Sequence, residues 1–316
     1  MSDDYLWDRS GQPDPEIEQL ERILGPLGYR PKRPAASPPA GSLLRHRWLP
    51  ILLVAAAILA VISLGLAPLF YGRSGTWEVA ALCGTPTVND AVMRGTGQLA
   101  KGQWLVTDAS SRAEIAVGAI GRVEVEPNTR VRLVDTRLTE HRMELSRGTM
   151  HARIWAPPRL FFVNTPSAEA IDLGCAYTLR VDDAGQTHLL VTYGYVALNL
   201  NGRESRVPTG AACETRPGIG PGTPHFEDAS EALRAALAKI DFERGATAEV
   251  ATVLAEARPR DSLTLWHLLT RVARADRGPV YDRLAVLSPP PPGVTRAGIL
   301  DLDEHMLTAW QQELGI

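Results

Sequence analysis

Cysteine is scarce in the 316-residue chain, which contains only Cys83, Cys175 and Cys213. They form no CxxC pair, and no Cys/His spacing typical of zinc ligands is present, which argues against a structural zinc site. One disulfide with one thiol left over is compatible with an oxidising compartment. The pair we favour is Cys175 with Cys213, because both lie in one β-rich region. The alternative is that all three are small buried hydrophobic residues.

Recognisable catalytic patterns are also lacking. The seven histidines are scattered without an HxxxH or HxH pair, so the sequence predicts no metal site. GRSG at 72–75 is not a nucleophile elbow, and GIGPG at 218–222 lacks the Lys-Ser/Thr of a phosphate-binding loop. We therefore predict no catalytic residues, no cofactor and no enzymatic activity.

The chain has little excess charge of either sign, with a formal net charge of −3. A nucleic-acid-binding protein would show a basic stripe, so we expect no nucleic-acid partner. The composition, 45% hydrophobic and 22% charged, argues against a wholly disordered chain. Proline and glycine gather near 25–41, 208–224 and 289–298, which divides the chain into units.

A long uncharged segment is the clearest feature that is present. Residues 48–71 read WLPILLVAAAILAVISLGLAPLFY. About 20 apolar residues are enough for a helix to cross the hydrocarbon core. A cleaved signal peptide has a shorter core that lies nearer the N-terminus, and a buried helix of a soluble domain is rarely so uniformly apolar. We predict a single retained transmembrane helix.

Basic residues indicate the orientation of this helix. They precede it at Arg30, Lys32, Arg33, Arg45 and Arg47, whereas only Arg73 closely follows it. The positive-inside rule then places the N-terminus in the cytoplasm and residues 72–316 outside it. We predict a single-pass protein of a bacterial inner membrane with a periplasmic C-terminal part.

The N-terminal tail, residues 1–29, contains a predicted short amphipathic helix that begins at Asp14-Pro15-Glu16. A helix this short is marginal alone in water, so its apolar face needs a partner. We predict that this face and Trp7 bind a protein; the membrane surface and a frayed tail are the alternatives. The apolar residues recur at helical spacing: Ile17, Leu20, Ile23, Leu24 and Leu27. Residues 30–47 form a basic, proline-rich linker.

Residues 75–222 are predicted to form an all-β domain. Apolar and polar residues alternate in short runs bounded by turn residues, as in half-buried strands. The turns recur every 8–12 residues, which fits a sandwich, a barrel or a solenoid. The runs are 112–118, 121–127, 129–135, 141–148, 150–157, 160–166, 177–183, 188–194 and 195–202.

Four stretches carry a family resemblance: GQWLVTDASSRAEIAVGAIGRVEVEPNTRVRLV, MELSRGTMHARI, FFVNTPSAEAIDLGCAYTLRV and LLVTYGYVALNLNGRESRVPTGAACE. Their order over about residues 98–215 resembles the FecR domain. The glycines suit turns or close strand approach, and Thr165-Pro166 ends a strand because proline cannot donate to a ladder. Ligand contact by residues 165–168 is the alternative. The matching positions are Gly148, Val163, Thr165, Pro166, Ala168, Gly174, Tyr177, Val191, Gly194, Val196 and Gly210.

The resemblance implies a regulator, similar to an anti-sigma factor, that signals across the membrane. Outside, it would bind a protein partner such as an outer-membrane receptor; inside, it would control an extracytoplasmic-function sigma factor. Signalling members of the family carry a longer cytoplasmic domain than the 47 residues that precede the span here. The competing hypothesis is a structural module that binds peptidoglycan or another envelope component without signalling.

The C-terminal part, residues 226–316, is predicted to be helical. The expected helices lie at 226–242, 246–257, 262–275, 277–287 and 301–314. They would form a small bundle or one or two helical repeats, or pack on the β domain as a cap. The predicted fold is therefore a single transmembrane helix, an all-β FecR-like domain and a small α-helical C-terminal region.

Overall fold

The computed structural model describes residues 75–243 and 247–315. The chain divides into two units, residues 1–71 and 72–316. The predicted tail, linker and transmembrane helix all lie outside the described residues. Among the residues that are described, no helix has the length and apolar character needed to cross a membrane.

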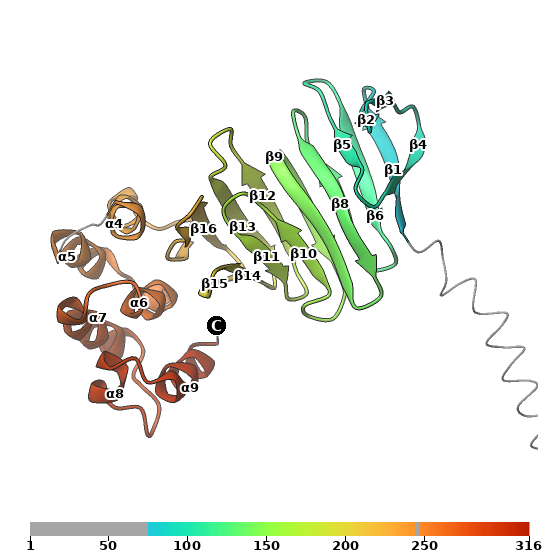
Figure 1. Cartoon of the computed structure of the whole chain (residues 1–316). Coiled ribbons are helices and arrows are strands. Elements are labelled where there is room, and N and C mark those ends of the chain that lie inside the picture. Colours follow the sequence, from blue (N-terminus) through green and yellow to red (C-terminus); the bar gives the residue numbers. More distant parts are fainter. Residues whose placement is uncertain (1–74, 244–246, 316) are drawn as a thin grey trace, which may run out of the picture. The chain divides into compact units, whose positions relative to one another are not determined.

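The β-rich domain consists of two sheets that share one strand (Figure 1). Sheet A has the order β4, β1, β6, β7, β9, β12, β13, β16, with β17 and β18 beside β16. Sheet B has the order β3, β2, β5, β8, β9, β10, β11, β14, β15. The strands are β1 (Thr76–Cys83), β2 (Thr87–Val88), β3 (Ala91–Val92), β4 (Thr96–Ala100), β5 (Trp104–Val106), β6 (Arg112–Val117), β7 (Gly121–Val125), β8 (Arg130–Arg137), β9 (Glu140–Ile154), β10 (Phe161–Asn164), β11 (Glu169–Asp172), β12 (Ala176–Val181), β13 (Thr187–Tyr193), β14 (Tyr195–Leu200), β15 (Arg203–Pro208), β16 (Ala211–Arg216), β17 (Gly220–Pro221) and β18 (His225–Phe226).

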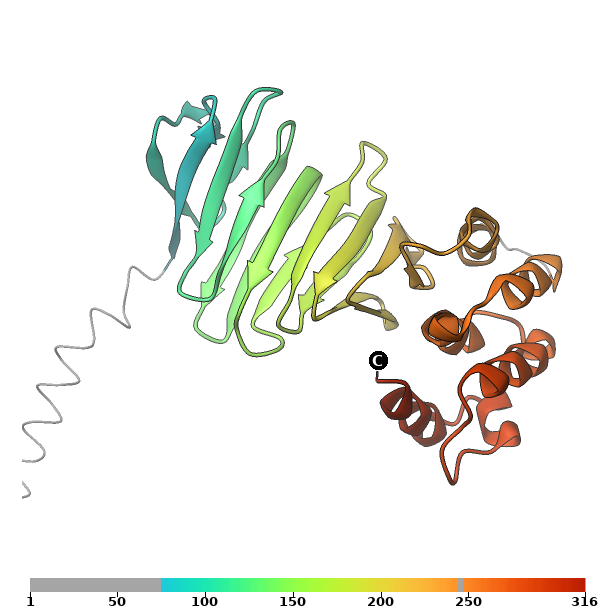
Figure 2. The same ribbon diagram turned by 180° about the vertical axis from the view of Figure 1, so that it is seen from behind.

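The chain alternates between the two sheets as it advances from β1 to β16, so the domain combines features of a sandwich and of a solenoid (Figures 1 and 2). Hairpins such as β6–β7 and β12–β13 lie in sheet A, and β10–β11 and β14–β15 lie in sheet B. Within the described residues, only the β9–β10 pairing is parallel. The predicted all-β domain is confirmed.

Strand β9 differs from the prediction of two strands at 141–148 and 150–157. It is one strand of 15 residues. Its first half pairs with β8 and β10 in sheet B, and its second half pairs with β7 and β12 in sheet A. Gly148 lies between the halves with φ of 94°. A glycine there lets the strand turn from one sheet into the other without ending, because it adopts positive φ at little steric cost.

Alternate residues of both sheets point inward and form one apolar core. In β6, for example, Ala113, Ile115 and Val117 are fully buried, whereas Arg112 is exposed and Glu114, between Ala113 and Ile115, is half-buried. This alternation is what the period-2 pattern predicts. The outer faces of the sheets therefore carry mostly polar side chains.

The helical region has a core of its own and also packs on the β domain. Trp310 is fully buried and contacts Tyr281 edge to face, with ring centroids 5.3 Å apart. Leu263 instead belongs to the β-domain core, so α6 packs against the β domain. The five predicted helices are confirmed, and α8 is additional. The helices are α4 (Glu231–Phe242), α5 (Thr247–Glu256), α6 (Ser262–Leu269), α7 (Arg274–Leu287), α8 (Arg296–Leu300) and α9 (Glu304–Leu314), with a 3-10 turn, η2 (Pro259–Asp261), before α6.

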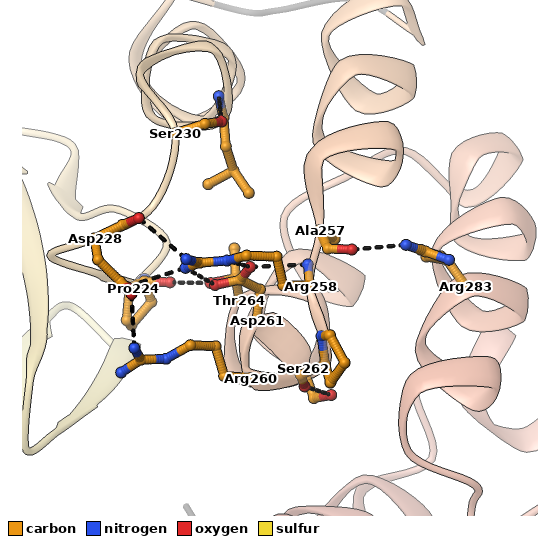
Figure 3. Close-up of polar contacts among 12 residues, drawn as sticks. Pro224, Asp228, Ser230, Ala257, Arg258, Arg260, Asp261, Ser262, Thr264 and Arg283 are labelled. Atoms are coloured by element: carbon orange, nitrogen blue, oxygen red, sulfur yellow. Dashed lines mark hydrogen bonds and ion pairs between the residues drawn. The ribbon is translucent and has the colours of Figure 1, made fainter.

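Polar contacts connect the helices to the end of the β domain (Figure 3). The Thr264 hydroxyl donates to the carbonyl of Pro224 over 2.8 Å. Arg258 donates to the buried carboxylate of Asp261 and to the exposed carboxylate of Asp228, over 2.8 and 3.1 Å. Arg260 also reaches Asp228 over 2.8 Å. These contacts fix α6 against the last strands.

The predicted disulfide between Cys175 and Cys213 is not formed, since both residues are buried free thiols. Cys175 immediately precedes β12 and Cys213 lies on β16, and β13 separates these strands in sheet A. Two strand spacings amount to about 9.5 Å, whereas a disulfide needs Cα atoms within about 7 Å. The Cys213 thiol instead donates to the carbonyl of Gly222 over 3.3 Å, and burial raises its pKa to about 12. Cys83 is exposed.

Candidate partner-binding surface

The outer face of sheet A carries a hollow of about 730 Å³ across β6, β7, β9, β12 and β13. Most of its lining side chains alternate along each strand with buried core residues, so the strand period places them on the solvent side, while the buried Ala152 and Tyr177 form part of its floor. They are Arg112, Glu114, Arg122, Glu124, Glu126, His151, Ala152, Arg153, Trp155, Ala176, Tyr177, Thr178 and Thr192.

Ion pairs organise one side of this hollow. Arg112 donates to both oxygens of Glu126, over 3.0 Å from Nε and 2.7 Å from Nη2. These contacts raise the pKa of Arg112. Arg122 reaches Glu114 over 3.2 Å on the neighbouring strand. Such pairs are exposed and contribute little to stability, but they hold the charged groups in place for a partner.

His151 extends this network toward β12. Its Nδ1 lies 2.8 Å from the Thr178 hydroxyl, and its Nε2 lies 3.3 Å from Glu126. The imidazole is therefore held by groups on both sides. Arg153, two residues further along β9, is exposed and forms no ion pair within the described part of the chain. Its guanidinium is available to a carboxylate from outside.

Two large aromatic residues are exposed at one end of sheet A. The exposed fractions of Trp155 and Tyr193 are 64% and 71%. Trp155 directly follows the end of β9, and Tyr193 ends β13. Ala176 on the intervening β12 pairs with both Tyr193 and Arg153, which places the two aromatics at the same end of the sheet. The Trp155 indole donates to the carbonyl of Ala119 over 3.3 Å, which fixes the ring.

The surface carries the kinds of residue that are common at protein-recognition sites. Tryptophan, tyrosine and arginine are enriched among the residues that dominate binding energy at protein interfaces. In the two described ranges, 75–243 and 247–315, no group of three His, Cys, Asp or Glu side chains could hold a metal ion. We name the hollow with Trp155 and Tyr193 the aromatic face of sheet A.

The predicted tail residues Trp7, Ile17, Leu20, Ile23, Leu24 and Leu27 lie outside the described residues. The family-motif residues are not gathered at one site but spread through turns and core. Tyr177 is buried, and its hydroxyl has no partner among the described residues. Gly174, Gly194 and Gly210 adopt positive φ. A side chain at Gly194 would meet the carbonyl of Gly174 at 2.3 Å, so these two turns need a glycine to pack together.

Thr165 and Pro166 follow β10, as predicted for a strand end. The Thr165 hydroxyl accepts from the backbone N–H of Ala168 over 3.0 Å and lies 2.8 Å from its carbonyl. Ser167 in this turn is buried and contacts Thr187 over 2.7 Å. The side chains of the turn are therefore occupied with the turn itself and with the neighbouring strands.

The sequence analysis missed Trp155, Tyr193 and Arg153. Trp155 was included in a predicted strand, but one strand pattern does not say which of its aromatic residues stay exposed after the sheets pair. The sequence signal that could have indicated their exposure was the alternation along this strand, in which Ala152 and Ile154 are apolar core positions and Arg153 and Trp155 lie on the other face.

A family model described as FecR protein matches residues 103–197. The chain carries a FecR domain. The resemblance derived from the sequence is thereby confirmed over most of its extent. The matched segment runs from β5 through β13 into β14, and it includes the five strands that line the hollow: β6, β7, β9, β12 and β13.

Two crystal structures of a protein described as "a putative anti-sigma factor" from Parabacteroides distasonis ATCC 8503 are similar to part of the chain. They are 17% and 16% identical to it, with TM-scores of 0.34. The match covers 42% of this chain and 63% and 62% of theirs, less than two thirds of those proteins. The comparison with curated proteins gave no match.

Proposed function

We propose that the protein is a membrane-anchored FecR-like regulator whose aromatic face binds a protein partner outside the cytoplasm. The partner class that the FecR resemblance implies is an outer-membrane receptor. The tail at residues 1–29 would pass the bound state to an extracytoplasmic-function sigma factor. Residues 48–71 would connect the two sides of the inner membrane.

The observation that supports partner binding is the joint exposure of Trp155 and Tyr193 beside fixed charges. An exposed apolar side chain on its own is ordinary, but two large aromatics at one sheet end, next to a hollow of about 730 Å³, are typical of an interaction site. The ion pairs of Arg112 and Arg122 would supply the polar rim that interfaces usually have.

The orientation can be tested with the native cysteines, because Cys83 is exposed while Cys175 and Cys213 are buried. A maleimide that cannot cross membranes should label Cys83 in intact spheroplasts. Cys83→Ser is the matched control and should remain unlabelled. Labelling of Cys83 only after the membrane is permeabilised would contradict the orientation.

Partner binding can be tested by placing a photo-cross-linking amino acid at Trp155 in cells. Leu138, on the turn between β8 and β9, is the control position because it is 82% exposed and lies away from the hollow. We expect a cross-linked protein of the outer membrane from position 155 and none from position 138. Equal products from both positions would contradict a specific aromatic face.

The envelope-binding alternative makes a different prediction in the same experiment. Position 155 would then yield no protein adduct, and the full chain would sediment with isolated peptidoglycan. Trp155→Ala would reduce that sedimentation if the same face were used.

A further inference from the structure

Strands β8 and β9 pair in sheet B, and one cross-strand pair of their outward-facing side chains has two charges of the same sign. The other cross-strand pairs of charged residues combine opposite signs, which stabilises a sheet. In contrast, Arg130 lies directly opposite Arg147. Two cations in that position repel each other unless an anion lies between them. The opposite-sign pairs are Arg137 with Glu140, Asp135 with Arg142, and Arg132 with Glu144.

A β-bulge produces this arrangement. The register shifts between Arg130 and Val131, because Val131 pairs with Leu145 while Arg130 pairs with Arg147. Ser146 is therefore an extra residue in β9. Bulges redirect side chains and are frequent beside functional sites. Here the bulge leaves both Ser146 and Arg147 on the side of a pocket that Arg130 also lines.

Trp104 on β5 holds Arg130 in place. The guanidinium carbon of Arg130 lies 4.0 Å from the centre of the indole ring, within the range of a cation–π contact. Arg132 also lies near this ring, at 4.9 Å, but its guanidinium donates to Glu144 over 3.1 Å. Stacking thus fixes the plane of Arg130 and leaves the N–H groups at its edge free to donate.

Neither Arg130 nor Arg147 forms an ion pair with any of the described residues. Asp90, on the turn between β2 and β3, lines the same pocket but pairs with neither of them. The pocket has a volume of about 370 Å³, within the usual range for a small-molecule site. Its lining is Asn89, Asp90, Trp104, Val106, Arg130, Ser146 and Arg147.

We propose that this pocket binds a phosphate group. Guanidinium groups recognise phosphate through paired N–H donors, and two of them here converge from adjacent strands. The Ser146 hydroxyl adds a further donor. Asn89 and Asp90 offer acceptors for hydroxyl groups on the alcohol to which the phosphate is esterified. A free phosphate ester and a phospholipid headgroup share this chemistry. The site lies on sheet B and does not rest on the proposed partner surface of sheet A.

The first test is isothermal titration of the full-length protein in detergent with inorganic phosphate and with glycerol phosphate, at constant ionic strength. Saturable binding at about one site is expected. Arg130→Gln and Arg147→Gln should each weaken it at least about tenfold, because each removes a charge-assisted hydrogen bond. Arg180→Gln, on the outer face of sheet A, is the matched control and should bind like the wild type.

Thermal unfolding separates binding from folding in these variants. Removing one of two opposed cations should leave the melting temperature unchanged or raise it. Absence of saturable binding in the wild type would overturn the proposal. An equal loss of affinity in Arg180→Gln would also overturn it, because binding would then follow overall charge.

A competition experiment distinguishes the two sources of phosphate. The full-length protein is placed in nanodiscs of phosphatidylcholine alone or with added phosphatidylglycerol, and titrated with glycerol phosphate. An anionic headgroup, whose phosphate charge is not offset by choline, would compete with glycerol phosphate and weaken its apparent affinity in the phosphatidylglycerol discs for the wild type but not for Arg147→Gln. Equal affinity in both discs would support a soluble phosphate ester.

Discussion

The thiol of Cys175 donates a hydrogen bond to the carboxylate of Asp172 over 2.7 Å, at a site closed to solvent. Asp172 ends β11 in sheet B and Cys175 leads into β12 in sheet A, so the contact closes a passage of the chain between the sheets. Burial raises the pKa of Asp172 to about 6, although hydrogen bonds from Cys175 and Gly174 partly oppose the increase. Burial and the nearby carboxylate raise the pKa of the Cys175 thiol, which therefore stays protonated.

The raised pKa of Asp172 predicts that the stability of the fold depends on pH. Because its pKa is higher in the folded chain, the folded state binds more protons between about pH 4 and pH 6, and the free energy of unfolding falls as pH rises through that window. The decrease corresponds to about 3 kcal/mol for a shift of about two pKa units. Below about pH 4 the free energy of unfolding shows none of this decrease, and above about pH 6 the decrease is complete.

Asp172→Asn should remove this dependence while keeping an acceptor for the Gly174 N–H. Urea denaturation at pH 4, 5, 6 and 7 would measure it, with Asp183→Asn in the exposed β12–β13 turn as the control. A wild-type pH profile that matches the Asp172→Asn profile would contradict the assignment.

Gly148 should resist substitution more than another glycine with similar φ. Gly148→Ala would bring Cβ to 2.5 Å from the Cα of Thr129, whereas Gly102, at φ of 86°, has no atom within 4 Å of such a Cβ. We expect about 1 kcal/mol of destabilisation for Gly102→Ala from backbone strain alone, and about 3 kcal/mol or more for Gly148→Ala. Chemical denaturation of the two variants measures the difference. Equal losses would show that the close approach to Thr129 does not matter.

The two carboxylates that bind Arg258 should differ in importance. Asp261 is fully buried and also accepts the backbone N–H of Arg258 over 2.9 Å, whereas the side chain of Asp228 is 55% exposed. Asp261→Ala removes the buried acceptor of the Arg258 backbone N–H and guanidinium and should cost about 2 kcal/mol. Asp228→Ala should change the unfolding free energy little, because water replaces an exposed partner. Chemical denaturation of both variants measures the two changes in unfolding free energy. A larger loss for Asp228→Ala than for Asp261→Ala would contradict this account of how Arg258 is held.

Trp155 and Trp310 should give opposite results when each is changed to alanine. Trp155 is exposed, so Trp155→Ala should leave stability nearly unchanged and weaken co-purification of the partner outside the cytoplasm. Trp310 is fully buried in the helical core, and Trp310→Ala should lower the unfolding free energy by about 3–5 kcal/mol. A large stability loss in Trp155→Ala would mean that the residue supports the fold.

The β domain could be predicted because its strands alternate with period 2, as in RVEV of β7 and YTLRV of β12. The sharing of β9 between two sheets could not, because pairing partners are set by tertiary contacts that a single strand does not encode. For the same reason the sequence could not exclude a Cys175–Cys213 disulfide: only the sheet order shows that β13 lies between the two cysteines. The Arg130–Arg147 contact depends on a one-residue bulge, which no local pattern predicts.

Co-purification from membranes tests the regulatory proposal most directly. The full-length protein would be compared with a variant that lacks residues 2–29. The account predicts that a cytoplasmic sigma factor is recovered with the full-length protein and lost from the variant, while partners outside the cytoplasm are retained by both. Identical partners for the two proteins, all of them envelope components, would contradict signalling through the tail.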